Sequence, residues 1–291
     1  MSLTAFSLVC LAALLHAGWN LATKRAGASG APFIWAVAVV SSVLWAPLAL
    51  GVHGAEVTKL SLAAWTCIAA SALIHVAYFL ALLHAYRVAD LSVVYPVAHG
   101  SGPLAASLLA LPLLGEALGP WGAAGLGMIG AGPFMIAGGP ALLSGAHSPR
   151  VMTGIGWGAL TGLTIAAYTL NDGYAVRHLG VPPLLFDWLG ILGRALLLTP
   201  WVWWARDDLS PMVRRSWRVV VVVALLSPAA YILVLYAMTL APVSRVAPAR
   251  ELSMLIATLF GARLLGEPDM WRRLAGAALI AAGVAALSLG R

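Results

Sequence analysis

The chain has little charge, almost no cysteine and no long polar stretch. Charged residues make up 9% of its 291 residues, whereas 62% are hydrophobic. About a quarter of the residues in a typical soluble domain are charged. This composition therefore excludes a soluble domain and predicts a chain embedded in a lipid bilayer. The two cysteines, Cys10 and Cys67, both lie in apolar runs, which excludes a disulfide framework or a cysteine-based zinc site.

The basic residues form no continuous stripe and do not precede the first apolar run. The net charge is +7, but lysine and arginine are scattered between apolar runs, which is typical of loop anchors and not of a nucleic-acid surface. Lys24 and Arg25 follow the first run instead of preceding it. We therefore expect no nucleic-acid partner and no cleavable signal peptide, and we expect the first run to remain as a helix.

What the chain does contain is a series of apolar runs separated by short polar or Pro/Gly-rich breaks. Each run has about the 20 residues that a helix needs to cross about 30 Å of hydrocarbon. The sequence predicts an all-α polytopic membrane protein with ten transmembrane helices, whose sizeable connections are residues 52–60, 141–150 and 205–218. The ten predicted spans are residues 3–23, 31–51, 61–86, 91–114, 119–138, 151–176, 183–204, 219–240, 243–265 and 270–289.

One motif occurs twice. Leu114-Gly115-Glu116 closes the fourth span and Leu265-Gly266-Glu267 closes the ninth, and a span rich in small residues follows each. This duplication predicts a first five-helix repeat over residues 1–140, a linker over 141–150 and a second five-helix repeat over 151–291. Because five is odd, the two repeats are inverted relative to each other. Lysine and arginine favour the face reached after the odd-numbered spans, which predicts that face to be cytoplasmic and both termini to lie outside.

Several aromatic and polar pairs stand at matching places in the two halves. Trp19-Asn20 in the first span is answered by Tyr168-Thr169 in the sixth, and Tyr95-Pro96 opens the fourth. Together with the repeated Leu-Gly-Glu, these residues resemble the EamA-type branch of the drug/metabolite transporter superfamily over nearly the whole chain. The resemblance implies a carrier with alternating access and a central cavity shared by both halves. It also implies frequent proton coupling and frequent export of metabolites such as amino acids.

The repeated Leu-Gly-Glu itself indicates structure more than function. Glu116 and Glu267 stand where one helix stops and the next starts. A carboxylate at such a place can accept hydrogen bonds from the free amide groups of a helix start and is favoured by the helix dipole. We therefore expect both glutamates to stabilise helix ends.

Ionisable residues deep in the spans are more informative, because charge in hydrocarbon persists only against a cavity or a partner. Arg194 lies near the middle of the seventh span, and Asp187 lies seven residues earlier on the same face, at about 10 Å of rise. That separation predicts no direct pair. Arg194 either meets a carboxylate or phosphate of the substrate, or pairs structurally with a neighbouring helix.

The fourth and ninth spans carry a proline just before polar groups. Arg250 and Glu251 follow Pro248, and His99 follows Tyr95-Pro96. Proline loosens a helix, as expected of helices that line a carrier cavity. In relatives that this sequence resembles, an arginine commonly takes the place of His99. In the alternative interpretation, Arg250 and Glu251 neutralise each other or other helices and hold the halves together.

Histidines recur in the first half, at positions 16, 75, 84 and 99. His16 and Asn20 share a helix face with Trp19 beside them, and His75 and Tyr78 share another. With an ordinary pKa of about 6.5, a cavity histidine could carry a coupling proton. The alternative is a hydrogen-bonded interior histidine. No pair has metal-ligand spacing with a supporting carboxylate.

These residues predict a secondary active transporter for a small anionic or zwitterionic metabolite, such as an amino acid, an organic acid or a phosphonate-like compound, by proton-coupled export. The first span has no carboxylate, which disfavours a cationic-drug antiporter. The alternative is a flippase for a lipid-linked phosphate. An enzyme is not expected, since no catalytic constellation is present. The predicted substrate-binding residues are His16, Trp19, Asn20, His75, Tyr78, Tyr95, His99, Tyr168, Asp187, Arg194, Arg250 and Glu251.

The fifth and tenth spans contain almost nothing polar. Ala123, Gly127 and Ala131 are four residues apart and predict a close helix contact, either inside the chain or between two chains. The expected partners are a small metabolite, the lipid bilayer and a coupling proton, with the protein a monomer or a homodimer. We expect no cofactor and no metal, and a multi-pass location in the cytoplasmic (inner) membrane.

Overall fold

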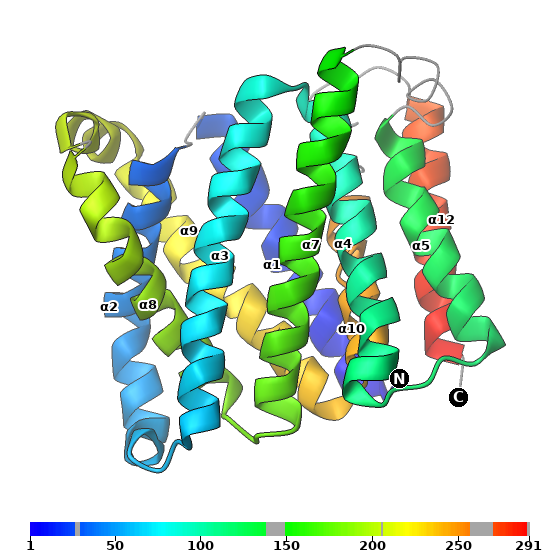
Figure 1. Ribbon diagram of the computed structural model, residues 1–291, viewed down its shortest axis with the longest axis horizontal. Coiled ribbons are helices and arrows are strands. Elements are labelled where there is room, and N and C mark those ends of the chain that lie inside the picture. The colour runs from blue at the N-terminus through cyan, green and yellow to red at the C-terminus, as the bar shows by residue number, and fades with distance from the viewer. Residues whose placement is uncertain (27–29, 138–148, 205, 257–269, 290–291) are drawn as a thin grey trace.

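The computed structural model describes the whole chain except residues 27–29, 138–148, 205, 257–269 and 290–291. The described part is helical throughout and contains no strand, and its helices stand side by side (Figure 1). They are α1 (Leu3–Ala26), α2 (Ala31–Val57), α3 (Leu62–Val88), α4 (Leu91–Leu114), α5 (Pro120–Ala137), α7 (Pro149–Arg177), α8 (Pro183–Trp204), α9 (Arg206–Leu240), α10 (Val243–Ala249) and α12 (Met270–Leu289).

Seven helices of the described part are long and apolar enough to cross a membrane: α1, α2, α3, α4, α7, α8 and α9. A helix of 27 residues, such as α2 or α3, is about 40 Å long and exceeds the hydrocarbon thickness. The predicted class, an all-helical multi-pass membrane protein, is confirmed. Ten crossings and an inverted repeat stay predictions, because α10 is short and residues 257–269 lie outside the described part.

Two of the predicted connections are wrong. Most of residues 52–60 belongs to α2, which ends at Val57, and most of residues 205–218 belongs to α9, which begins at Arg206. The sequence prediction places a break between helices wherever polar residues occur. Polar residues do not end a helix, however, where water or lipid headgroups can solvate their side chains. Gly51 and Gly54 cost α2 about 1 kcal/mol each relative to alanine, which weakens the helix without stopping it. The predicted linker at 141–150 lies mostly outside the described residues.

Helices of the two predicted halves alternate in space. α1 packs against α9, α2 against α8, and α3 against α7, while α4 also packs against α7. The α2–α8 pair lies at one end of the molecule and the α5–α12 pair at the other (Figure 1). The amino group of Met1 lies 3.4 Å from the carbonyl oxygen of Ser288, so the two ends of this chain meet on one face. The two halves therefore share one interior.

Glycine seams bring two pairs of these helices close together, α4 with α7 and α5 with α12. On α7, a Cβ added to Gly158 would lie 2.9 Å from the Cβ of Val97 on α4, and one added to Gly154 would lie 3.1 Å from Val93. On α5, a Cβ on Gly132 would lie 2.8 Å from the carbonyl oxygen of Gly276 on α12. Such contacts let helix backbones approach directly, which is how small residues stabilise helix pairs in lipid.

The predicted seam of Ala123, Gly127 and Ala131 does not pack inside this chain, and its alternative, a contact between two chains, stays a prediction. All three residues are exposed on α5, and a Cβ on Gly127 would meet nothing within 4 Å. The residues that contact α12 are Gly125 and Gly132, which lie seven residues apart on another face of the helix. Small residues thus stand on more than one face of α5, so their spacing alone could not choose the face that meets α12.

Glu116 stabilises a helix end, but of a distant helix. Its two carboxylate oxygens accept hydrogen bonds from the backbone amides of Val243 at 2.7 Å and Ser244 at 2.8 Å, the first residues of α10. The sequence predicted this kind of contact and not its partner, since α5 follows Glu116 directly. Glu116 thus joins the end of α4 to the start of α10. Glu267 lies outside the described residues.

Candidate functional site

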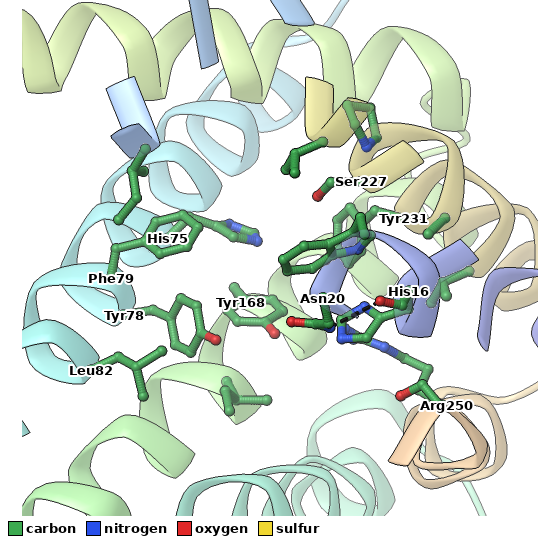
Figure 2. A pocket seen from close by; sticks show the side chains of 18 of the residues that line it. His16, Asn20, His75, Tyr78, Phe79, Leu82, Tyr168, Ser227, Tyr231 and Arg250 are labelled. Atoms are coloured by element: carbon green, nitrogen blue, oxygen red, sulfur yellow. Dashed lines mark hydrogen bonds between the residues drawn. The ribbon is translucent and has the colours of Figure 1, made fainter. Parts of the chain in front are cut away.

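A cavity of about 390 Å³ lies between the helices of the two halves. Side chains of α1, α2, α3, α4, α7, α8 and α9 line it together with the segment from Ala247 to Ser253 (Figure 2). Every substrate-binding residue that the sequence predicted lines this one cavity: His16, Trp19, Asn20, His75, Tyr78, Tyr95, His99, Tyr168, Asp187, Arg194, Arg250 and Glu251. The structure thus brings them together, although it holds no ligand that would test their binding role.

The α1 wall of the cavity offers polar atoms. The side-chain amide of Asn20 donates to the carbonyl oxygen of His16 at 3.0 Å, one turn earlier. The rings of His16 and Trp19 meet edge to face, with centroids 4.9 Å apart. The indole Nε1–H of Trp19 is buried and has no hydrogen-bond partner among the described residues. A buried donor without a partner in a cavity wall can be satisfied by a ligand or by water.

Four rings form what we call the aromatic wall: His75 and Tyr78 of α3, Tyr168 of α7 and Tyr231 of α9. His75 stacks on Tyr168, with centroids 4.1 Å apart and an interplanar angle of 24°. Tyr231 meets His75 edge to face at 5.7 Å, and Tyr78 meets Tyr168 in the same way at 5.9 Å. The Nδ1 of His75 lies 2.8 Å from the carbonyl oxygen of Ser71, which fixes the ring. Three helices thus present one rigid surface to a flat or apolar group.

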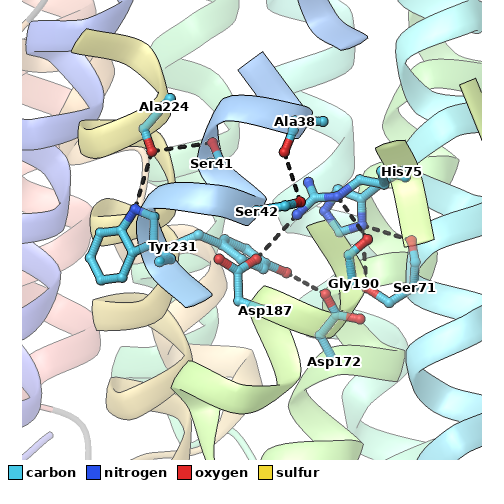
Figure 3. Close-up of polar contacts among 12 residues, drawn as sticks. Ala38, Ser41, Ser42, Ser71, His75, Asp172, Asp187, Gly190, Ala224 and Tyr231 are labelled. Carbon is cyan, nitrogen blue, oxygen red and sulfur yellow. Dashed lines mark hydrogen bonds and ion pairs between the residues drawn. The ribbon is translucent and has the colours of Figure 1, made fainter. Parts of the chain in front are cut away.

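Arg194 and Asp187 form a direct ion pair, so the prediction that they are too far apart is wrong. A guanidinium nitrogen of Arg194 lies 3.2 Å from Oδ1 of Asp187, and its Nε donates to the carbonyl oxygen of Gly190 at 3.3 Å. Helical side chains lean toward the N-terminus, and the long arginine side chain therefore reaches back over two turns. Oδ2 of Asp187 is buried without a hydrogen-bond partner among the described residues (Figure 3).

The helix at Pro248 is interrupted where the sequence predicted loosening. α10 ends at Ala249, Arg250 and Glu251 form a turn, and helical conformation resumes at Leu252. The guanidinium carbon of Arg250 lies 5.4 Å from the centroid of the Tyr231 ring, a cation–π contact. Arg250 also forms a hydrogen bond with the side chain of Tyr168. Arg250 and Glu251 do not form a close ion pair with each other or with another described residue, but their opposite charges attract each other. The interpretation in which the two charges compensate each other therefore stays an alternative.

Facing this turn, α4 contributes Tyr95 and His99. Their rings are in contact, with centroids 4.2 Å apart and an interplanar angle of 35°. Both residues line the cavity together with Arg250 and Glu251. The two proline-containing segments that the duplication matched, one from each half, therefore meet across the same space.

Asp172 and Tyr231 were not predicted as site residues. Asp172 on α7 is fully buried and accepts a hydrogen bond from the hydroxyl of Tyr231 at 2.6 Å and from the side-chain amide of Asn171 at 2.9 Å (Figure 3). An aspartate inside an apolar run was the available signal, but Asp172 lies close to the predicted end of its span at residue 176. α7 continues to Arg177, and nothing in the sequence pairs Tyr231 with it.

The arrangement suits reversible binding of a small ionic molecule. Arg250 supplies a positive charge and Glu251 a negative charge, and neither is held in a close ion pair with a described residue. The aromatic wall supplies an apolar surface beside them. Trp19 Nε1, Thr169 Oγ1 and Asp187 Oδ2 add polar atoms that lack partners among the described residues. In the same part of the chain, no three histidine, cysteine, aspartate or glutamate side chains come together as metal ligands would.

In comparisons with known proteins, the second half of the chain matches a family model, and the whole chain matches solved structures in fold. The sequence model of the EamA-like transporter family matches residues 152–289. No curated protein matches the chain. Twenty-six chains of solved structures match it, and one of them, described only as the crystal structure of a protein, has a TM-score of 0.79 and 20% identity. That match covers 99% of this chain and 98% of the other, and at this identity it shows the fold alone.

Proposed function

We propose that this chain, which belongs to the EamA-like transporter family through residues 152–289, is a secondary carrier that exports a small zwitterionic metabolite by alternating access. The family makes it a membrane transporter of the drug/metabolite type. The substrate, the mechanism and the location in the cytoplasmic membrane are our proposals. The observation that carries them is a cavity between the two halves whose wall holds one positive and one negative side chain, Arg250 and Glu251, that are not locked in a close ion pair with a described residue.

Helix pairing supports an inverted repeat. If α1, α2 and α3 are exchanged for α7, α8 and α9, the α1–α9 contact becomes the α7–α3 contact, and the α2–α9 contact becomes the α8–α3 contact. The α2–α8 contact maps onto itself, as an axis between the halves requires. Duplicated carriers place their substrate site at such an interface, and alternating access follows from rocking one half against the other.

Charge balance favours a zwitterion over a simple anion. Arg194 is already paired with Asp187, so the cavity charges outside that ion pair that remain for a ligand are those of Arg250 and Glu251. A carboxylate on Arg250 would be complemented, but the neighbouring Glu251 would remain a buried bare charge, which is costly. A molecule with a carboxylate and an ammonium group satisfies both. A neutral α-amino acid with an apolar side chain against the aromatic wall fits this pattern.

The alternatives fit the site less well. A flippase for a lipid-linked phosphate would need cationic contacts for the headgroup, whereas a carboxylate stands next to each cavity arginine: Asp187 against Arg194 and Glu251 after Arg250. Repulsion from those carboxylates would oppose a phosphate. An enzyme would need a nucleophile or an acid–base pair aimed at a reacting atom. The described cavity residues are arranged instead as complementary charges around an aromatic surface.

Transport by purified protein in liposomes tests the proposal. We expect radiolabelled neutral L-amino acids to cross the membrane, and [14C]lactate and methylphosphonate not to. Arg250→Ala should lower the rate of amino-acid transport by at least about 100-fold, since a buried hydrogen-bonded charge contact is worth about 3 kcal/mol or more. Arg245→Ala, on the same helix but outside the cavity, is the matched control and should keep full transport.

Other outcomes of this assay would contradict the proposal. Translocation of a fluorescent phospholipid without amino-acid transport would indicate a flippase. Transport of lactate or methylphosphonate that equals amino-acid transport would show that Glu251 meets no ammonium group. Equal rates for Arg250→Ala and the wild type would remove Arg250 from the site.

A further inference from the structure

α9 is longer than a membrane crossing requires, and its first part is charged. The helix has 35 residues, from Arg206 to Leu240. The 22 residues from Val219 to Leu240 carry no charged side chain and are about 33 Å long, which is enough to cross about 30 Å of hydrocarbon. The preceding residues, 206–218, include four arginines and two aspartates. This first part of α9 therefore lies at the level of the lipid headgroups.

One face of the first part of α9 is turned toward the protein. Met212 and Val219 pack against a buried cluster that includes Phe33 of α2, and Ser216 between them is 7% exposed. Positions 212, 216 and 219 are four and three residues apart, so they form one stripe along the helix. The other faces of this segment point away from the protein.

The outward face is basic. Arg214, Arg215 and Arg218 are exposed, and no hydrogen bond or ion pair joins them to another described residue. Arg214 and Arg218 are one helical turn apart and lie on the same side. The guanidinium carbon of Arg218 lies 5.4 Å from the centroid of the Trp217 ring, which is itself exposed. We call Arg214, Arg215, Trp217 and Arg218 the basic face of α9.

Tryptophans at the end of α8 mark the depth of this segment in the bilayer. Trp201, Trp203 and Trp204 are 54%, 69% and 89% exposed, and Trp201 and Trp204 form a shallow groove with Leu197 and Pro200. The end of α8 and the start of α9 lie together at one edge of the molecule (Figure 1). An exposed tryptophan is most stable at the membrane interface, where its ring meets acyl chains and its N–H meets headgroups or water. The basic face thus begins at the headgroup layer.

We propose that the basic face of α9 binds an anionic phospholipid of the surrounding bilayer. The planar guanidinium groups of Arg214 and Arg218 suit the oxygens of a phosphate diester, and Trp217 lies among the headgroups beside them. A zwitterionic lipid fits less well, because its own ammonium group is repelled by the same arginines. None of these residues lines the cavity, so this site does not depend on the proposed function.

A lipid held at this face stabilises a helix that also contributes to the cavity. Tyr231, which belongs to the aromatic wall, lies on α9 at about 20 Å of rise from Arg218. A ligand that binds only the folded protein raises its stability by mass action. Anionic lipid should therefore raise the unfolding temperature, and the basic face should be needed for that effect.

Binding of single lipid molecules is the first test. Purified protein in an uncharged detergent is mixed with dioleoylphosphatidylglycerol or dioleoylphosphatidylcholine, and native mass spectrometry counts the lipids that stay bound. We expect the anionic lipid to bind at least about tenfold more tightly. Arg214→Gln/Arg218→Gln should weaken its binding about 20-fold, since each arginine at an anionic surface contributes about fivefold. Arg214→Lys/Arg218→Lys should stay within about threefold of the wild type, because the charge is kept.

The matched control removes two exposed arginines elsewhere on the same edge of the molecule. Arg87→Gln/Arg150→Gln changes the end of α3 and the start of α7 and should bind phosphatidylglycerol as the wild type does. An equal loss in this control would show that net charge, and not the basic face, attracts the lipid. Displacement of phosphatidylglycerol by an excess of inorganic phosphate would indicate a site for a free phosphate. Either result would overturn the inference.

The second test is made in a bilayer. The wild type should unfold at a higher temperature in liposomes that contain phosphatidylglycerol than in liposomes of phosphatidylcholine alone, and added salt should reduce this difference. Arg214→Gln/Arg218→Gln should unfold at the same temperature in both. Each protein is compared with itself, so a less stable variant does not affect the result. An equal gain from phosphatidylglycerol in the variant and the wild type would contradict the proposed lipid site.

Discussion

At the scale of single residues, what matters in this cavity is which charges have partners. Two arginines lie in its wall, but Arg194 is joined to Asp187 on its own helix, whereas Arg250 contacts the ring of Tyr231 and the side chain of Tyr168 and forms no close ion pair with a described residue. A paired charge contributes to folding, because breaking it leaves the partner bare. A cavity charge outside a close ion pair is left for a ligand. The two arginines therefore have different expected roles.

Removal of Arg194 is expected to destabilise the protein. Arg194→Ala leaves the carboxylate of Asp187, which is 2% exposed, without its counter-ion, and should cost about 3–5 kcal/mol of stability. The double variant Arg194→Ala/Asp187→Asn removes both charges and should recover much of that loss. Thermal unfolding of the purified variants, followed by tryptophan fluorescence, gives the comparison. A double variant no more stable than Arg194→Ala would mean that the ion pair is not the reason for the loss.

The sequence could predict the members of the site but not their pairing. Ionisable residues inside apolar runs are costly unless they face a cavity or a partner. Residues selected for this reason, and the aromatic residues beside them, all line one cavity in the structure. The Asp187–Arg194 pair was missed because rise along the helix was counted without the reach of the side chain. Tyr231 was missed because a tyrosine in an apolar run is unremarkable until its hydroxyl is seen against Asp172.

At the scale of helices, glycine decides how closely the halves meet. The α7 glycines at positions 154, 158 and 162 lie against α4, so a helix of the second predicted half touches one of the first with almost no side chain between them. The sequence predicted small-residue packing on α5, but inside the chain the packing uses Gly125 and Gly132 and not Ala123, Gly127 and Ala131. A glycine every fourth residue marks a face, and only the position of the neighbouring helix tells whether that face is buried.

A bulky residue in the α7 seam is expected to force these helices apart. A Cβ at Gly158 already lies 2.9 Å from Val97, so Gly158→Leu should cost about 1–3 kcal/mol through overpacking. Gly156 on the same helix meets nothing within 4 Å, and Gly156→Leu should be neutral or slightly stabilising. The two melting temperatures in the same detergent give the result. Similar losses for both variants would show that helix propensity, and not the seam, is responsible.

At the scale of the whole molecule, the two halves form one interior instead of two bundles. The α1–α9, α2–α8 and α3–α7 pairs each join one half to the other. The duplication in the sequence predicted two halves, and the lengths of the apolar runs predicted most helix boundaries within a few residues. The sequence could not predict that helices of the two halves pack against each other, because neither the repeat nor the length of an apolar run indicates which helices are neighbours.

The proton-coupled export that the sequence predicts should move net charge across the membrane. A zwitterion leaves without net charge while one proton enters, so an inside-negative potential is expected to accelerate export. About 100 mV contributes about 2.3 kcal/mol per charge, which corresponds to a roughly 50-fold change in the final gradient of the amino acid. Liposomes with a potassium diffusion potential set by valinomycin provide the measurement. A gradient that does not respond to the potential would contradict an exchange of one proton for one zwitterion.

The contact between α5 and α12 has a consequence for how the gene tolerates change. Gly125 lies against the backbone of Gly283, and Gly132 lies against the backbone of Gly276. A Cβ atom added to any of these four glycines would collide with the opposite helix. In a library that samples every amino acid at every codon, selection for folded protein should leave these four positions invariant. Gly127, between two of them, should accept nearly everything. The pattern of accepted and rejected substitutions would then identify the contact between α5 and α12 without any structural measurement.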